Sequence, residues 1–283
     1  MVIFLHIPKT AGTTFEFVLA NSFGIRHCHL GYTGRDIIRQ KDLDFARRIF
    51  PGLRSVSGIN LINPLGLSAP NPFYMTFVRE PVVRVFSHYQ DTVLRSKNRL
   101  SFEEMLFSDD VLQNLQVQLI AGERNLDKAK RCLDRFDFVG LTEKFDLSLH
   151  ALKRLCPHGL NPNYKRKQTA RDNSIKKSLE NDPRIVEMTR EHNKLDLALY
   201  SFAVSEVFPR VCAKAGFSPA DRVASFDKYS SVVKLKFLLH RIYNKGFFRE
   251  ICKSVYRSSD APAAAKGQQP SASGGPPWAR NST

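Results

Sequence analysis

Acidic residues, paired cysteines and long apolar runs are all scarce in this sequence of 283 residues. Only 27 Asp and Glu stand against 43 Lys and Arg, so the formal net charge is +16. A surface this basic attracts polyanions such as nucleic acid, an anionic membrane, acidic glycans or a phosphate-rich cofactor. The alternative interpretation is that the charge serves solubility alone.

The cysteines are few and lie far apart in the sequence. None of the five belongs to a CxxC pair. Their scattered spacing fits neither a zinc site nor a disulfide framework. An odd number leaves at least one thiol free, and a reduced compartment is the simpler interpretation. One or two bridges remain compatible with the count.

Signals for membrane insertion and for secretion are also missing. No stretch reaches the roughly 18 apolar residues that a membrane span needs. The apolar start, Val2 to Leu5, is too short for the core of a signal peptide. We therefore expect a cytoplasmic protein, unless the chain is a fragment that lacks an anchor.

What the chain does contain is an alternation of short apolar strands and amphipathic helices. Val2 to Leu5 reads as a buried strand, and a helix is expected from Thr13 to Phe23. A second unit has a strand at Phe73 to Val78 and a helix from Val82 to about Leu94. Another strand is expected within 136–141, and further helices are expected over 111–120 and from about 185 to 203. This order predicts an α/β, P-loop-like three-layer fold with a central parallel β-sheet flanked by helices.

The composition changes after the first 221 residues. Between Asp227 and Arg257 there are eight Lys or Arg and two acids, interleaved with apolar residues. We predict three parts: a main domain at 1–221, a basic amphipathic helical extension at 222–259 and a disordered tail at 260–283.

The loop from His6 to Thr14 has the composition of an anion site. A loop between a strand and a helix N-terminus directs several backbone N–H groups at one point. Lys9 adds a positive charge, and Gly12 lets an anion approach the backbone. Because Lys9 precedes Gly12, the order is not that of the nucleotide triphosphatase loop GxxxxGK[ST]. The alternative is a capped helix whose Thr residues serve only the backbone.

A second candidate element follows the strand at Phe73 to Val78. Arg79 lies at the end of that strand, where α/β folds place ligands, and Ser87 lies two turns into the next helix. Arg79 can hold a phosphate in bidentate fashion while Ser87 donates a hydroxyl to it. The alternative is a surface ion pair between Arg79 and Glu80.

Taken together, the two elements resemble the donor-binding segments of sulfotransferases. FLHIPKTAGTTF and FYMTFVREPVVRVFSHY are similar to the two signatures of the carbohydrate branch, which includes heparan sulfate 2-O- and 6-O-sulfotransferases and the chondroitin-type enzymes. NLQVQLIAG, FDFVGLTEKFDLSL and HNKLDLALYSFA extend the resemblance over about residues 2–205. It implies transfer of a sulfuryl group from 3′-phosphoadenosine 5′-phosphosulfate (PAPS) to a hydroxyl acceptor, a carbohydrate in this branch.

The resemblance also assigns residues to the two ends of the donor. The 5′-phosphosulfate is assigned to Lys9, Thr10, Ala11, Gly12, Thr13 and Thr14. Arg79 and Ser87 would hold the 3′-phosphate, and the basic loop that contains Lys165 and Arg171 would close over the nucleotide. Lys9 would neutralise the leaving phosphate, as in phosphoryl transfer, and no metal is required.

The general base is where the chain departs from its relatives. They commonly place a His after a Gly on the preceding strand, and the corresponding residue here is Ile59. Among the remaining candidates, we select His29, which shares one side of an extended segment with His27. His6 and Glu80 are alternatives, and so is a degenerate enzyme that binds the donor and transfers poorly.

Two other classes of function compete with this prediction. One is a basic protein that binds nucleic acid or a membrane surface and carries a degenerate nucleotide site. The other is a phosphotransferase, which the missing Mg²⁺-binding acids and P-loop disfavour. The preferred interpretation expects a glycan acceptor, a peripheral contact of the basic tail with anionic membrane, and no nucleic acid. A Golgi-type enzyme is expected only if an anchor is missing from this chain.

Overall fold

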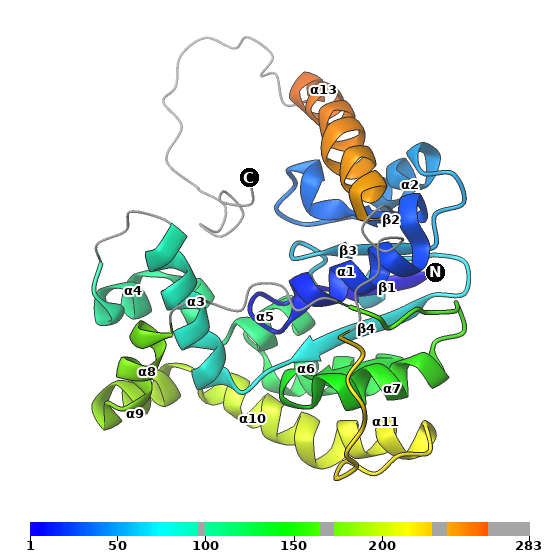
Figure 1. The fold of residues 1–283 in the computed structure, drawn as a ribbon. Coiled ribbons are helices and arrows are strands. Elements are labelled where there is room, and N and C mark those ends of the chain that lie inside the picture. Colours follow the sequence, from blue (N-terminus) through cyan, green and yellow to red (C-terminus); the bar gives the residue numbers. More distant parts are fainter. Residues whose placement is uncertain (96–99, 165–172, 228–236, 260–283) are drawn as a thin grey trace, which may run out of the picture.

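The core of the protein is a five-stranded, all-parallel sheet in the order β2-β3-β1-β4-β5 (Figure 1). A computed structural model describes residues 1–95, 100–164, 173–227 and 237–259. The strands are β1 Val2–Leu5, β2 His27–His29, β3 Ser55–Gly58, β4 Phe73–Val78 and β5 Phe138–Leu141. Because all five run in one direction, their carboxyl ends meet at one edge of the sheet, where α/β folds bind ligands.

Helices lie on both sides of the sheet. Those that follow β1 and β4 are α1 Gly12–Phe23 and α3 Pro81–Arg95. The others are α2 Gln40–Ile49, α4 Phe102–Ser108, α5 Leu115–Ala121, α6 Leu126–Arg135, α7 Phe145–Leu155, α8 Ser174–Glu180, α9 Pro183–His192, α10 Lys194–Phe202, α11 Phe208–Lys214 and α13 Arg249–Ser259. Two π-helical turns, η6 Ala203–Val207 and η7 Ile242–Phe248, precede α11 and α13.

The sheet divides the apolar core into two layers. Alternate residues of a strand point to opposite faces, and β1 shows this directly. Ile3 and Leu5 pack with α2, α5, α6 and α10, whereas Val2 and Phe4 pack with α1 and α7. Helix–sheet–helix is the three-layer arrangement that the strand and helix order predicted.

Two predicted helices turn out to be interrupted, each at an asparagine. The segment expected to be helical over 111–120 becomes α-helical only at Leu115, because Asn114 adopts a left-handed backbone with φ 48°. The segment expected over 185–203 is divided into α9 and α10 by Asn193, whose side chain donates to the carbonyls of Leu112 and Thr189. A tertiary contact therefore breaks a helix that its apolar pattern favours.

The end of the described chain folds back on the edge strand β2. Residues 237–259 are helical, and every fourth side chain is buried: His240, Asn244, Phe248 and Cys252. Phe248 and Cys252 join the layer of the core that contains Ile3 and Leu5. Figure 1 shows α13 beside α2 and β2, while 260–283, the predicted disordered tail, lie outside the described residues. None of the helices in the described ranges is long and apolar enough to cross a membrane.

Candidate functional site

The loop between β1 and α1 has the backbone of an anion-binding nest. Lys9 and Ala11 both have positive φ angles, 69° and 62°, a conformation that non-glycine residues rarely adopt. Alternating right- and left-handed residues direct successive N–H groups to one side, and the N-terminus of α1 adds its dipole. Within the described part of the chain, no side chain of the N-cap residue Ala11 caps α1. The N-cap position of α1 is therefore not filled by the Ser, Thr, Asp or Asn that usually caps a helix.

Gly12 is required by its neighbour as well as by any ligand. A Cβ at this position would lie 1.9 Å from Cδ2 of His6. The imidazole therefore occupies the space that a side chain would need at the start of α1. His6 also contacts the Phe4 ring, with centroids 5.8 Å apart, so it is wedged between the sheet and the loop.

Lys9 points from the loop to helix α3. Its Nζ lies 3.3 Å from Oδ2 of Asp91, which also binds Nε of Arg95 at 2.7 Å. Burial lowers the pKa of Lys9, and the Asp91 carboxylate opposes that effect. Ser87 lies one turn before Asp91 and therefore on the same face of α3, toward the loop.

Arg79 connects the two predicted donor elements directly. One guanidinium nitrogen donates to the carbonyl of Lys9 at 2.8 Å, across 70 residues of sequence. The backbone of Arg79 is held by Gln116, which accepts from its N–H and donates to its carbonyl, both at 2.9 Å. Nε of Arg79 is buried and has no hydrogen-bond acceptor within the described ranges. A buried donor on a cation without an acceptor is suited to an anionic ligand.

The expected alternative for Arg79, an ion pair with Glu80, is not formed. The Glu80 carboxylate instead accepts from the backbone N–H of Val83 at 2.7 Å, in the first turn of α3. Among the described residues, the carboxylate closest to Arg79 belongs to Glu143, at 4.0 Å from Nε. The Glu80 carboxylate therefore caps α3, and the Arg79 guanidinium contacts the loop between β1 and α1 instead.

The remaining predicted donor residues have different settings. Thr10 is buried, and its hydroxyl donates to the carbonyl of Ile7 at 2.9 Å, which shapes the loop from within. Thr13 and Thr14 lie in the first turn of α1. Lys165 and Arg171 lie outside the described residues.

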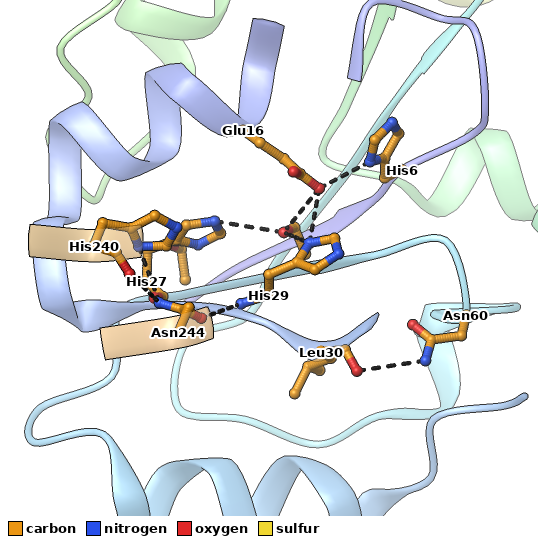
Figure 2. A network of polar contacts seen from close by, with 10 residues as sticks. His6, Glu16, His27, His29, Leu30, Asn60, His240 and Asn244 are labelled. Atoms are coloured by element: carbon orange, nitrogen blue, oxygen red, sulfur yellow. Dashed lines mark hydrogen bonds and ion pairs between the residues drawn. The ribbon is translucent and has the colours of Figure 1, made fainter. Parts of the chain in front are cut away.

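The carboxyl ends of β2 and β3 carry a second polar cluster (Figure 2). Oε1 of Glu16, on α1, lies 2.8 Å from Nδ1 of His6 and 2.9 Å from Nδ1 of His29. Ser57 of β3 faces His29 in the parallel register, and its Oγ lies 3.1 Å from Nδ1 of His29. The same Oγ is 3.4 Å from Nε2 of His27, so both histidines of β2 point to one side, as their alternation predicted.

Sequence similarity decides the family. The profile of the Sulfotransferase family matches residues 1–203, well over half of the chain. The chain belongs to the Sulfotransferase family. Membership implies a PAPS-dependent transferase and leaves the acceptor unspecified. A search of curated proteins found no significant match.

A solved structure also matches this sulfotransferase. It is a sulfotransferase from Alicyclobacillus acidocaldarius, 16% identical, with a TM-score of 0.47. The match covers 73% of this chain and 96% of the bacterial one. The family profile ends before the helical segment 237–259.

That segment reaches back into the polar cluster of the sulfotransferase. Asn244 accepts from the N–H of His29 at 2.9 Å and donates to the carbonyl of His27 at 3.0 Å. Its amide thus pairs with the exposed edge of β2 as a neighbouring strand would. His240, one turn earlier, stacks on His27 with centroids 5.0 Å apart.

Charge is distributed unequally over the cluster. Burial alone would raise the pKa of Glu16, but His29 and His6 hold it well below its usual value. Burial alone would lower the pKa of His29, and the Glu16 carboxylate outweighs it, so that this pKa is raised. Burial and neighbouring His240 keep the pKa of His27 well below its ordinary value. Of the two imidazoles of β2, His29 is therefore the one whose protonated form its surroundings favour.

Glu16 is the residue that the sequence analysis missed. It is the single acid in an otherwise apolar stretch, Phe15-Glu16-Phe17-Val18-Leu19, directly after the anion loop. An acid this close to a predicted anion loop would repel the anion unless it has a cationic partner nearby. That conflict was the available signal.

Ile59, in the place of the family's usual His, is followed by a structural asparagine. Asn60 donates to the carbonyl of Arg35 at 2.8 Å and so ties β3 to the loop after β2. No group of three or more His, Cys, Asp or Glu that could hold a metal occurs among the described residues. All five cysteines fall in the described ranges and are buried free thiols.

Proposed function

We propose that this sulfotransferase binds PAPS between the loop of Lys9 to Thr14 and the Arg79–Ser87 element. The first would hold the 5′-phosphosulfate and the second the 3′-phosphate. The observation that carries the proposal is the contact of Arg79 with the Lys9 carbonyl, which joins both anion sites. The nest backbone and the Arg79 Nε without an acceptor in the described chain support it.

The chemistry follows from the residues at the loop. In sulfuryl transfer, the acceptor oxygen forms a bond to sulfur while the bond from sulfur to the bridging oxygen breaks. Negative charge builds on the leaving phosphate, where Lys9 and the N-terminus of α1 stabilise it. Because Lys9 is paired with Asp91, it must exchange the Asp91 carboxylate for that phosphate.

The proton of the acceptor hydroxyl is assigned to His29. Its Nδ1 faces Glu16 and Ser57, which leaves Nε2 to act as the base. The basic surface suits an acidic glycan as acceptor. Lys165 and Arg171, which lie outside the described residues, are proposed to close over the nucleotide.

The outer face of the helical segment 237–259 supports a peripheral contact with anionic membrane. It exposes the apolar side chains Leu238, Leu239, Ile242, Phe247 and Val255. Arg241 and Lys245 lie exposed between them. An apolar stripe with interleaved cations is typical of interfacial helices. Sedimentation with phosphatidylserine vesicles, compared with phosphatidylcholine vesicles, tests the contact.

The donor proposal is tested by calorimetry with 3′-phosphoadenosine 5′-phosphate (PAP), the product nucleotide. We expect tight binding to the wild type and a loss of roughly 10- to 100-fold in Arg79→Ala, because hydrogen bonds to charged groups are worth about 1.5–3 kcal/mol. Arg210→Ala is the matched control. It removes the same charge from an exposed ion pair with Asp134 on the surface of α11.

Absence of a heat signal with the wild type would overturn the donor site. Equal weakening in both variants would show that net charge, and not Arg79, holds the nucleotide. A transfer assay with labelled PAPS over a panel of glycans and small hydroxyl compounds then identifies the acceptor class.

A further inference from the structure

One carboxylate oxygen, Oε1 of Glu16, is shared by two imidazoles and a hydroxyl. His6 and His29 approach it at 2.8 and 2.9 Å, and the Ser57 hydroxyl at 3.3 Å. We propose that Glu16 is the positioning residue of the acceptor half: it orients His29 as the base and links that base to the donor loop through His6. The inference rests on the proposed function, in which His29 accepts the proton.

The contact of Glu16 with Nδ1 selects the tautomer of His29. An ionised carboxylate only accepts hydrogen bonds, so Nδ1 must carry a proton and donate it. The lone pair is then on Nε2, which makes no hydrogen bond within the described part of the chain. A carboxylate behind an imidazole also stabilises the imidazolium that forms when Nε2 takes a proton.

The position of His29 in the sheet fits this role. It is the last residue of β2 and is aligned with Ser57, and Ser57 in turn is aligned with Phe4 of β1. His29 thus ends its strand at the edge where the β1 loop begins, with a side chain 16% exposed. Gly31 leaves the ring uncovered, because a Cβ there would lie 2.6 Å from Nε2. His6 is less suited, since Gly12 and Phe4 enclose it.

The link through His6 is a rigid one. Glu16 lies one turn after Gly12, and the His6 ring fills the space at Gly12. A shift of the loop on binding a phosphate would therefore move His6 and the carboxylate together. Asn244 fixes the other end of the arrangement by holding the backbone N–H of His29.

Several titratable groups face His29 from different elements, and each contributes to its pKa. Glu16 of α1 raises it, whereas burial and the charge of Lys245 of η7 lower it. The other ionisable groups around it are His6 after β1, His27 of β2, Tyr32 of the turn after β2, and His240. Glu16 is the only one of these that is negative at neutral pH.

Glu16→Gln tests the proposal, with Glu187→Gln of the exposed face of α9 as the matched control. The readouts are the NMR titration of the histidine ring protons and the pH profile of sulfate release from PAPS with water as acceptor. In the wild type, the rate should rise with pH as His29 loses its proton, above the ordinary imidazole value. In Glu16→Gln, both the His29 midpoint and the rising limb should move down by about one pH unit or more. The plateau rate should fall about tenfold.

The outcomes separate this inference from the proposed function. If PAP binds and PAPS turns over but Glu16→Gln keeps the wild-type profile and His29 midpoint, the positioning role is overturned and the donor site stands. If the wild type binds no PAP, the donor site fails, and the NMR titration still decides the coupling of Glu16 to His29. PAP affinity within about twofold of the wild type shows that the variant is folded.

A second variant covers the case in which Glu16→Gln does not fold. Glu16→Asp keeps the charge and should retain a His29 midpoint above that of an ordinary imidazole. His29→Gln should remove the rising limb altogether. A rising limb that survives in His29→Gln would show that another group is the base, and the inference would then be wrong.

Discussion

The proposed donor half and the proposed acceptor half of the site draw their residues from the chain in opposite ways. The donor half, residues 6–14 and 79–87, consists of two continuous stretches, each at the end of one strand. The acceptor half, which we define as Glu16, His29, Ser57, His240 and Asn244, takes its five residues from α1, β2, β3 and the helical segment 237–259, spread over more than 220 positions. An anion site needs backbone N–H groups and therefore a local loop, whereas a positioned imidazole needs only contacts, which any element can supply.

This difference explains what similarity can detect. The family profile covers residues 1–203 and therefore both donor stretches. It does not reach Asn244 or His240, which belong to the helical segment 237–259 and contact the histidines of β2. The profile thus spans both stretches of the proposed donor half, whereas part of the proposed acceptor half lies beyond its end.

The largest expected effect concerns the anchor of the acceptor half. Phe248, the last residue of η7, is fully buried, and its ring packs edge-on against Phe50 with centroids 5.0 Å apart. Phe248→Ala should therefore lower the free energy of unfolding by about 3–5 kcal/mol. Phe247→Ala, its exposed neighbour, is the matched control. Chemical denaturation measures both. If the two variants are equally stable, the helical segment is an appendage and the acceptor half does not depend on it.

The next largest effect is expected from a substitution in the donor half alone. Lys9→Ala should reduce sulfuryl transfer by roughly 100-fold or more, about 3 kcal/mol, since one electrostatic stabiliser of the developing charge is lost. PAP affinity should fall much less, because backbone N–H groups and Arg79 remain. Single-turnover rates and calorimetry separate the two quantities, and Lys128→Ala, in an exposed ion pair with Glu123, is the control. Wild-type transfer in Lys9→Ala would remove Lys9 from the mechanism.

The smallest expected effect concerns the loss of stability at acidic pH that is caused by His240 of the acceptor half. Burial lowers the pKa of His240 to about 4, so its neutral form is favoured in the folded state. The unfolded chain takes up the proton first as pH falls below about 6.5, and stability is lost with it. Between pH 6.5 and 4.5 this amounts to roughly 2 kcal/mol.

His240→Gln should remove that part of the pH dependence, measured as the free energy of unfolding at several pH values. His29 contributes with the opposite sign, since its raised pKa favours the folded state at low pH. It is present in both proteins and cancels in the comparison. His192→Gln on α9 is the control, and a slope unchanged in His240→Gln would contradict the buried neutral state.

Much of the fold could be read from local patterns. The predicted strands at 2–5 and 73–78 match the structure at both ends, because buried parallel strands are continuous apolar runs. The interruptions at Asn114 and Asn193 could not be read, since these asparagines are held by groups about 80 residues away. The pairing of Arg79 with the Lys9 carbonyl was equally out of reach, although both residues were selected for their chemistry.

The sequence by itself determined the anion loop, the Arg79 element and the parallel α/β order, because each depends on neighbouring residues and on the period of a strand or helix. Only the tertiary structure decided which histidines face a carboxylate. Glu16, His29 and Asn244 carry no shared motif. They meet because β2 is the edge strand, with α1 next to it and the helix at 237–259 closing its open side.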